Sequence, residues 1–441
     1  MIYILIEKKS REYPAKILIA LELVARGIPV CIGFYRGLLP NLVEWPKGVT
    51  YFKGMNNVQI GLMKNVKSLG HEVVVTDEEA LRYCDANVQM MDCDPAAARF
   101  VDHVLCNNDT HREALANVRG FLPKQLIVTG NARLDLLRPP YTHAAQRKAT
   151  EIRERHGNFL LINTDFNWAN GKFSNVEEYK RFLANTGWIK TGSVVDNSII
   201  DDYIIYDETN LSAVRDLILE LNHTKPSLKV VLRPHPTEQV SNWIDFKSSV
   251  TNLEVIANSD PHIWMMAAGA VLQTGSTTGV EAAALGTPTI SLIRDKWKTR
   301  HHTYLLSNAV NPVAESVPEA IEMIEKIMAG KPIRSAQQEQ TLLREHLGIT
   351  PDRFAYHRIA DALLDATDIS RRSSTVKQSL AMSPAVEAVL RRSVPQKAFQ
   401  AGYLSISEVN NLIASLCVGD RHLIRPSVTD LGWGVYQLSP Q

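Results

Sequence analysis

The sequence predicts two α/β domains in tandem, each built on a parallel sheet that is covered by helices. Short β-rich runs alternate with segments of helical periodicity up to residue 140, and the same alternation resumes after residue 155. This alternation is typical of βαβ units, whose strands run parallel. The length of 441 residues also exceeds what a single hydrophobic core usually serves, so a second domain is expected.

The first set of elements occupies the first third of the chain. IYILIE is the expected first strand, and the helical pattern of YPAKILIALELVARG ends at Gly27, a residue suited to a helix stop. Further strands are expected in IPVCIGF, VTYFKG, HEVVVTDEEA, VDHVLCNN and QLIVTGN, interspersed with helices in NVQIGLMKNVKSLG and HREALANVRGF. Together these segments predict an N-terminal domain over residues 1–145.

A second set follows Pro139-Pro140 and a charged helix, which are expected to link the domains. The alternation continues through NFLLINTDF, NLSAVRDLILELN, LKVVLRPHP, LEVIANS, HIWMMAAG, AVLQTG, TTGVEAAALG and PTISLI. These segments predict a second domain over residues 155–345. Residues 167–205 are less regular and are expected to form a mobile loop, and residues 346–441 are expected to form a helical extension.

Composition and charge exclude several classes of protein. Lys and Arg number 48 against 47 Asp and Glu, so no overall positive field favours a nucleic-acid partner. No apolar run approaches the roughly 20 residues that cross a bilayer, and the first apolar stretch is too short for a secretion signal. The five cysteines are odd in number and include no CxxC pair, which fits a reducing cytoplasm better than a disulfide framework or a zinc site.

The stretch LQTGSTTGVEAAALGTPTISL carries the strongest indication of a ligand site. A strand ends before Gly275, and Ser276, Thr277 and Thr278 then open a helix. Free N–H groups and hydroxyls at the positive end of a helix bind phosphate well. Glu281 lies about one turn further along the helix, within reach of a ribose whose phosphate rests at the helix start. Ordinary N-capping by Ser and Thr is the alternative interpretation.

The stretch VVLRPHPTEQV ends another strand of the same domain with two prolines. Pro234 and Pro236 forbid further strand pairing and hold His235 between them. Open α/β sheets bind ligands beyond the carboxyl ends of their strands, so His235 is expected to donate a hydrogen bond to a phosphate, with Arg233 adding charge. The alternative is a structural Arg and His that close a loop.

Acidic residues at two strand ends are candidates for catalysis. Asp77, Glu78 and Glu79 follow a strand of the first domain in VVVTDEEAL, and Asp165 follows the first strand of the second domain in NTDFNWANGKFS. Clustered carboxylates raise one another's pKa toward values useful in proton transfer. One of them is expected to act as a base or a nucleophile. The alternatives are an acidic first turn of a helix and a plain polar loop.

Three other polar groups have less specific roles. Asn163, Asn167, Trp168 and Asn170 surround Asp165 and would suit sugar hydroxyls and an apolar sugar face. A second group consists of Asn131, Arg133 and Asp135, in which Arg133 is expected to form an interdomain salt bridge. No cluster with metal-ligand spacing accompanies His301-His302, so a loop is expected there and no metal site is predicted.

The His-Pro dipeptide after a strand, together with the Ser/Thr-rich helix start and GVEAAALGTP, resembles the GT-B glycosyltransferases that use CMP-activated sugars. These are the bacterial sialyl-, Kdo- and polysaccharide-export-linked Kdo transferases. The resemblance implies that His235, Pro236, Gly275 and the Ser/Thr helix start hold the CMP phosphate, and that Glu281 contacts the ribose. VVVTDEEAL and VTGNARLDLLRP further resemble a bacterial group of surface-carbohydrate biosynthesis proteins, in which glycine is usual where Ala80 stands.

The resemblance covers roughly residues 1–330 and implies a GT-B-like fold, with two Rossmann-like domains facing a cleft and a helical C-terminal extension. It implies a metal-independent glycosyltransferase without a cofactor. The donor would be a CMP-activated 2-keto sugar acid (Kdo or a nonulosonic acid), and the acceptor a surface glycan or glycolipid. His235 and the helix start would stabilise the leaving phosphate while an acid from 77–79, or Asp165, acts at the sugar. The protein is expected in the cytoplasm, with peripheral association at the inner face of the membrane.

Three other functions stay open at this point. A CDP-glycerol-type phosphotransferase also joins an His-Pro segment to a Ser-rich helix start, although no second His-centred motif is found in the first domain. A UDP-sugar enzyme of the GT-B type, either a transferase or a 2-epimerase, would share the fold. The third alternative is a non-enzymatic scaffold for glycan assembly.

Overall fold

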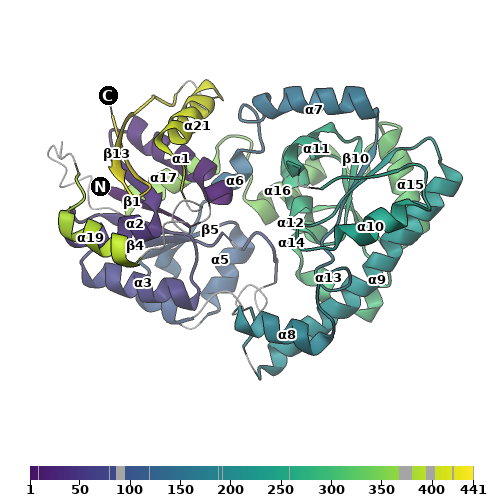
Figure 1. The fold of residues 1–441 in the computed structure, drawn as a ribbon, viewed down its shortest axis with the longest axis horizontal. Helices are drawn as coiled ribbons and strands as arrows, with labels where there is room; N and C mark the ends of the chain where they lie inside the picture. The colour runs from purple at the N-terminus through teal and green to yellow at the C-terminus, as the bar shows by residue number, and fades with distance from the viewer. Residues whose placement is uncertain are drawn as a thin grey trace. The chain divides into compact units, whose positions relative to one another are not determined.

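The computed structural model describes residues 1–7, 9–78, 80–85, 95–118, 120–186, 188–190, 192–257, 259–366, 380–393, 403–419 and 422–440. The chain forms two compact units (Figure 1). Unit 1 comprises Met1–Glu79, Asp92–Tyr141 and Leu347–Gln441, and unit 2 comprises Ala80–Met91 and Thr142–His346. The chain therefore begins in unit 1, contributes a short segment to unit 2, returns to unit 1, and then crosses to unit 2 and back once more.

Unit 1 is built on an eight-stranded sheet within the described residues, in the order β13-β14-β2-β1-β3-β4-β5-β6. The six strands of the N-terminal part pair in parallel, as the strand–helix alternation predicts. The last two strands form an antiparallel hairpin that pairs with β2. The strands are β1 (Ile2–Ile6), β2 (Val30–Phe34), β3 (Val49–Phe52), β4 (Glu72–Thr76), β5 (His103–Cys106), β6 (Leu126–Val128), β13 (Ser427–Gly432) and β14 (Val435–Ser439).

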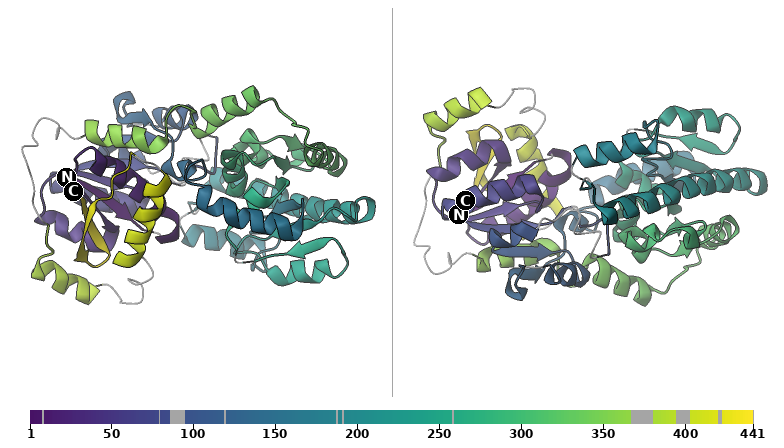
Figure 2. Two further views of the ribbon diagram at one scale, coloured as in Figure 1. Left: turned by 90° about the horizontal axis from the view of Figure 1, so that it is seen from above. Right: turned by 90° about the horizontal axis from the view of Figure 1, so that it is seen from below.

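The helices of unit 1 cover both faces of this sheet (Figures 1 and 2). One face packs against the first helix and two helices of the returning chain in a single apolar core, to which β14 contributes Tyr436 and Leu438. The helices are α1 (Lys9–Ala25), α2 (Tyr35–Leu38), α3 (Asn57–Ser68), α5 (Asp109–Ala116), α6 (Ala132–Asp135), α17 (Ala355–Asp365), α19 (Pro384–Ser393) and α21 (Ile406–Gly419). Because α1, α17 and α21 share this core, the returning chain is part of unit 1.

Unit 2 has a six-stranded sheet in the order β12-β11-β10-β7-β8-β9. Every strand pair is parallel within the described residues. The strands are β7 (Leu160–Asn163), β8 (Val230–Arg233), β9 (Leu253–Val255), β10 (Ala270–Gln273), β11 (Thr289–Leu292) and β12 (Val313–Ala314). This is the order of a dinucleotide-binding sheet, in which the strand sequence reverses beside the first strand.

Successive residues of the unit 2 strands enter two different cores. Ile162, Leu232 and Leu272 pack with α9, α10 and α15 on one face, and Leu161 and Val271 pack with α7, α11 and α12 on the other, as the period of two along a strand requires. The helices are α7 (His143–His156), α8 (Val176–Asn185), α9 (Val194–Thr224), α10 (Val240–Lys247), α11 (Pro261–Ala267), α12 (Thr277–Leu285), α13 (His301–Tyr304), α14 (Leu306–Val310), α15 (Val317–Met328) and α16 (Ala336–Leu347).

The irregular segment at 167–205 differs from its prediction as a mobile loop. It contains α8 and the start of the long helix α9. These helices bury a cluster of their own that includes Tyr179, Leu183, Ile200 and Tyr203. The pattern was not evident because polar residues interrupt the apolar ones and because Phe182, Val194 and Val195 are exposed.

The predicted helical extension at 346–441 also differs from the structure. It carries α17, α19 and α21, and it ends in the β13–β14 hairpin. Strand β14 is almost fully buried against β2, with Val435 and Leu438 at 0% exposure. The sequence GVYQLS is too short to reveal a strand by itself, and its burial depends on a sheet edge formed by distant residues.

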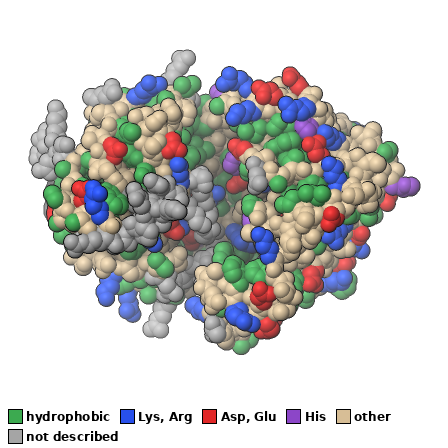
Figure 3. Space-filling view, in the orientation of Figure 1, with side chains coloured by type: hydrophobic (Ala, Val, Ile, Leu, Met, Phe, Trp, Pro, Cys, Tyr) green, Lys and Arg blue, Asp and Glu red, His purple; other side chains and the backbone are tan. Residues whose placement is uncertain are grey.

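Charge and hydropathy of the structure agree with the composition. Basic and acidic side chains are interspersed on the face drawn in Figure 3, without a continuous field of one sign. In the part of the chain that the structure describes, no helix has the length and apolar character needed to cross a bilayer.

The hairpin turn offers a test of this docking. Trp433 and Gly434 join the two strands with φ values of 54° and 66°, and a Cβ on Gly434 would lie 2.5 Å from Tyr403 Cβ. We expect Gly434→Ala to cost roughly 1–2 kcal/mol for the left-handed backbone and about 1–3 kcal/mol more for the clash, measured by urea unfolding.

Gly27→Ala is the matched control, because Gly27 has a φ of 82° but nothing within 4 Å of its Cβ position. It should therefore lose only the unfolding free energy that the left-handed backbone costs an alanine. Equal losses in the two variants would contradict the packing of the hairpin against Tyr403.

Candidate functional site

The carboxyl ends of β7, β8 and β10 form the candidate site of unit 2. Strand β7 lies between β10 and β8, with β9 beyond β8 and β11 and β12 beyond β10. The chain therefore reverses its direction of travel across the sheet between β7 and β10. In open α/β sheets the connections diverge at such a switch point, and ligands bind in the crevice that they leave.

A row of polar side chains crosses the sheet at its carboxyl edge. Asn163 is in register with Arg233 on one side and Gln273 on the other, so the three side chains share the face covered by α11 and α12. Gln273 donates to Ser291 and to Asn308 (3.3 Å to the latter). Asn163 is 1% exposed, and neither polar atom of its side chain has a hydrogen-bond partner among the described residues.

Helix α12 begins beside this row. Ser276 is its N-cap: its Oγ accepts from the Thr278 N–H at 3.3 Å and from the Thr278 hydroxyl at 3.0 Å. Gly275 has a φ of 116°, and a Cβ there would lie 2.5 Å from Leu305 Cδ1, so the turn into the helix requires glycine. Ser276 is thus used as a cap, while the Thr277 side chain is exposed at the first helical position.

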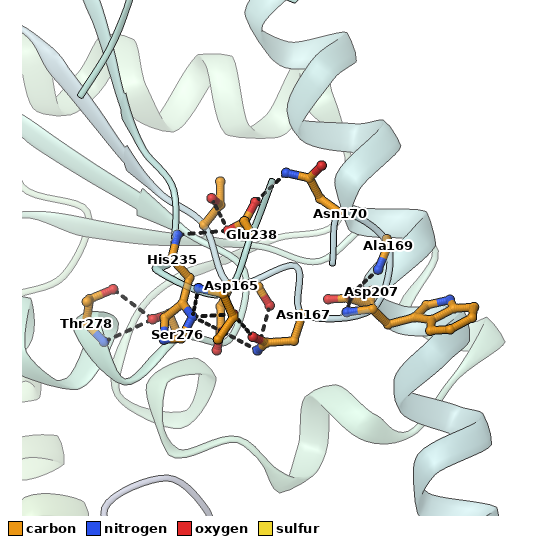
Figure 4. A network of polar contacts seen from close by, with 12 residues as sticks. Asp165, Asn167, Ala169, Asn170, Asp207, His235, Glu238, Ser276 and Thr278 are labelled. Atoms are coloured by element: carbon orange, nitrogen blue, oxygen red, sulfur yellow. Dashed lines mark hydrogen bonds and ion pairs between the residues drawn. The ribbon is translucent and has the colours of Figure 1, made fainter. Parts of the chain in front are cut away.

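One buried carboxylate fixes the loop that carries His235. Glu238 is 3% exposed and accepts four hydrogen bonds. Its Oε1 accepts from the Thr164 hydroxyl at 2.6 Å and the His235 N–H at 2.9 Å. Its Oε2 accepts from Asn170 Nδ2 at 3.0 Å and Trp243 Nε1 at 2.9 Å. The loops after β7 and β8 are therefore held to a common acceptor (Figure 4).

The His235 ring lies beside Asp165, and a chain of side chains joins them (Figure 4). Asp165 Oδ1 accepts from Asn167 Nδ2 at 2.5 Å, and Asn167 Oδ1 accepts from the Thr237 hydroxyl. The same hydroxyl lies 2.6 Å from His235 Nδ1, and the Thr237 N–H is 3.3 Å from that nitrogen. His235 Nδ1 also lies 3.9 Å from Asp165 Oδ1.

Helix α9 holds the rest of the loop after β7. Asp207 Oδ2 accepts from the backbone N–H groups of Trp168 (3.0 Å) and Ala169 (2.8 Å). Burial raises the pKa of Asp207 well above its usual value although both N–H groups act in the opposite direction. The predicted sugar contacts Trp168 and Asn170 are therefore engaged in holding the loop, through Asp207 and Glu238 respectively.

Glu281 and Arg233 lie on the α11–α12 side of the site. Glu281 Oε2 is 3.2 Å from His262 Nε2, and Arg233 donates to the Ser259 carbonyl at 2.9 Å. Burial lowers the pKa of Arg233, and the carboxylates of Asp260 and Glu281 oppose this effect. Pro236 follows His235 at an exposed position, where its ring limits the path of the loop.

The acids after β4 belong to unit 1. Asp77 and Glu78 are buried, at 5% and 6% exposure. The Asp77 carbonyl accepts from Asn107 Nδ2 at 3.3 Å, and Glu78 Oε2 is 3.8 Å from Arg133 Nη1. Glu79 lies outside the described residues. The predicted site residues thus fall into a group in unit 2 and an acidic group in unit 1.

Asp135 and His301, from two other predicted groups, make contacts that hold the fold. Asp135 accepts from the Ala355 and Tyr356 N–H groups at the start of α17, and burial raises its pKa to about 6. His301 packs between the rings of Tyr203 and Tyr206. Burial lowers the pKa of His301 to about 3.

The site has no metal-ligand cluster among the described residues, and two of its carboxylates were not predicted. Among the described residues, no group of three His, Cys, Asp or Glu side chains is arranged to hold a metal ion. The sequence analysis overlooked Glu238 and Asp207. Glu238 stands within the quoted VVLRPHPTEQV, and its signal was a carboxylate three residues after the histidine, where it can accept from the histidine's own N–H.

Comparison with known proteins identifies the fold. No protein-family model matches the chain, and no curated protein is significantly similar to it. The solved UDP-GlcNAc 2-epimerase of Methanocaldococcus jannaschii is 14% identical, with a TM-score of 0.53 over 83% of this chain and 100% of that one. A Listeria monocytogenes protein proposed to be a UDP-N-acetylglucosamine 2-epimerase is 13% identical, with a TM-score of 0.50 over 87% and 99%. The chain therefore has a GT-B-like fold with two parallel-sheet domains.

The contacts of Glu238 can be tested by an isosteric change. Glu238→Gln replaces one acceptor oxygen by an NH₂ group that faces two donors, so buried N–H or O–H groups lose their partner. We expect a loss of about 2–4 kcal/mol of unfolding free energy, measured in urea.

Glu208→Gln is the control, because Glu208 also accepts from an indole, Trp168 Nε1 at 2.8 Å, but at an exposed position. It should cost less than about 0.5 kcal/mol. A Glu238→Gln variant as stable as this control would show that the buried carboxylate is not needed to hold the two loops.

Proposed function

We propose that this protein is an enzyme that uses a nucleotide sugar, with unit 2 binding the donor and a UDP-sugar as the donor favoured by the comparisons. The observation that carries the proposal is the convergence at the switch point of unit 2. There the start of α12, the proline-flanked His235 and the carboxylate of Asp165 follow three neighbouring strands.

Each group has a role that its chemistry supports. The start of α12 offers N–H groups and the exposed Thr277 hydroxyl to a phosphate. His235 Nε2 has no partner among the described residues, and it can donate to the phosphate that leaves the sugar. Glu281, one turn into α12, is within reach of the ribose. Asp165 is placed to accept a proton or to balance positive charge at the anomeric carbon.

Transfer and 2-epimerisation share the step that these groups support. In both reactions the bond between the anomeric carbon and the nucleotide phosphate can break, and negative charge then develops on the phosphate. Donors fixed in advance stabilise this charge without reorganising during the reaction. In the proposal protein groups supply this stabilisation, so neither a metal ion nor a cofactor is assigned to it.

The choice of a UDP-sugar follows from the comparisons. The two structures with which this chain shares its fold are described as UDP-GlcNAc 2-epimerases, one of them provisionally. Transfer of a Kdo or nonulosonic acid from its CMP-activated form to a surface glycan or glycolipid is the second candidate. The resemblance carried by the His-Pro dipeptide and the Ser/Thr helix start favours it.

A nucleotide panel separates these candidates. Because a ligand that binds only the folded protein raises its melting temperature, we expect UDP and UDP-GlcNAc to protect the protein more than CMP, CMP-sialic acid or CDP-glycerol. Protection by the CMP compounds alone would favour ulosonic acid transfer. If no nucleotide protects the protein at millimolar concentration, the enzymatic proposal is wrong and a scaffold role gains support.

The role of His235 is tested with the preferred donor from that panel. Loss of one preorganised donor to the departing phosphate should lower turnover by about 10²-fold or more in His235→Ala. His223→Ala is the control, since His223 is an exposed residue of the last turn of α9. Turnover in His235→Ala close to that of the control would remove His235 from the mechanism.

A further inference from the structure

The segment after the acidic strand end of unit 1 packs on unit 2. Residues Ala80–Met91 belong to unit 2. Within them the Arg82 carbonyl accepts from the Leu306 N–H at 3.0 Å, and the Cys84 N–H donates to the Tyr304 carbonyl at 2.8 Å. Tyr83 and Leu305 form an antiparallel β-bridge between these contacts. The backbone on both sides of Tyr83 is therefore fixed to the junction of α13 and α14.

This junction adjoins the start of α12. Leu305 is 2% exposed and packs with Tyr206, Ile293 and the Tyr83 ring. Its Cδ1 lies 2.5 Å from the position that a Cβ on Gly275 would occupy. Gly275 immediately precedes the Ser276 cap. The segment is thus separated by one side chain from the turn at which the candidate phosphate site begins.

Arg82 projects from this segment with its hydrogen-bonding capacity unused. Its guanidinium lies over the rings of Tyr83 (5.3 Å to the centroid) and Trp188 (5.7 Å). The described residues provide it with no hydrogen bond and no ion pair. A guanidinium has five N–H donors in its own plane. Stacking on aromatic faces leaves these donors without a hydrogen-bond partner.

Arg82 stays charged and lies near the reacting groups. Tyr83, followed by Asp165, raises the pKa of Arg82 above its ordinary value, while burial acts in the opposite direction. Asp165 is within electrostatic reach but forms no ion pair with it. The Asp165 carboxylate is itself 3.9 Å from His235 Nδ1. Arg82 and His235 are therefore both within electrostatic reach of Asp165.

We propose that Arg82 is an anion-binding residue of the donor site, which holds the acidic group of the nucleotide sugar that lies nearest the sugar ring. This inference rests on the proposed function of unit 2. The group is either the second phosphoryl group of a nucleoside diphosphate sugar or the carboxylate of a sugar acid. Both present a pair of oxygen atoms that a guanidinium can bind through two parallel N–H bonds.

Arg82 is needed because two anionic groups of the ligand require two separate positive groups in the site. The start of α12 accommodates one phosphate, since the field of a helix end is confined to its first turn. A second anionic group needs a further cation. Arg82 supplies a positive charge on a partly buried guanidinium that two rings orient, so little side-chain entropy is lost when the anion binds.

The experiment compares Arg82→Met with Arg215→Met by isothermal titration calorimetry. Arg215 is the matched control, because its guanidinium also stacks on two rings, Trp243 at 5.6 Å and Phe246 at 5.8 Å. The ligands are UMP, UDP, UDP-GlcNAc, CMP, CMP-sialic acid and inorganic pyrophosphate. Melting temperatures of the unliganded variants report any structural damage. Arg82→Lys, which keeps the charge but loses the paired donors, provides a second variant in case the methionine variant does not fold.

If Arg82 binds a phosphoryl group, Arg82→Met weakens UDP and pyrophosphate by about 10-fold or more, and UMP by less than about 3-fold. If it binds a carboxylate, CMP-sialic acid loses affinity and CMP does not. Arg82→Lys should fall between the wild type and Arg82→Met in either case, and Arg215→Met should match the wild type throughout.

Equal loss for every ligand, or no loss for any, overturns the inference. If the wild type and Arg82→Met bind nucleotide sugars with equal affinity, the role of Arg82 is wrong but the proposed function stands. If the protein binds pyrophosphate through Arg82 but binds no nucleotide, Arg82 is an anion-binding residue and the proposed function is wrong. A wild type that binds none of these ligands contradicts both.

Discussion

The arrangement of the candidate site depends on the buried carboxylate of Glu238. Strand β8 ends in a sequence whose prolines cannot continue the sheet, and strand β7 ends in a polar loop. The loop after β7 contributes Phe166 to the apolar core, and the polar residues around it need other contacts. Glu238 accepts hydrogen bonds from both loops and from the indole of Trp243, a residue of the apolar core. A single anion thus ties two irregular segments to the most rigid part of unit 2.

The rest of unit 2 is organised around polar groups of two kinds. One kind is internally satisfied, as in Glu238, Asp207 and the Ser276 cap, and it fixes backbone positions. The other kind has no hydrogen-bond partner among the described residues: the Asn163 amide, the Nε2 atom of His235 and the Arg82 guanidinium. Buried or partly buried polar groups without partners are costly. Their presence together at a switch point is more easily explained by a ligand than by packing.

The sequence carried enough information for the fold and for part of this site. His235 and Ser276 could be assigned to strand ends because apolar runs stop abruptly before them, and a parallel sheet brings such ends to one edge. Two partners of Glu238 could not be predicted, since Thr164 and Asn170 are distant from it in sequence. The pairing of Arg82 and Cys84 with Tyr304–Leu306 depends on tertiary structure. Asp77 and Glu78 lie in unit 1, as their position after a strand of the first domain predicts.

The return of the chain to unit 1 affects how the protein can fold while it is being synthesised. Strand β2 is made early, but its partner β14 follows all of the residues of unit 2. Until β14 emerges from the ribosome, β2 is an open edge with unpaired N–H and C=O groups, which can pair with other chains. Unit 2 has no such dependence, because every strand of its sheet precedes residue 346. The domain that begins second can therefore finish first, and the nascent chain needs protection at one edge of its first sheet.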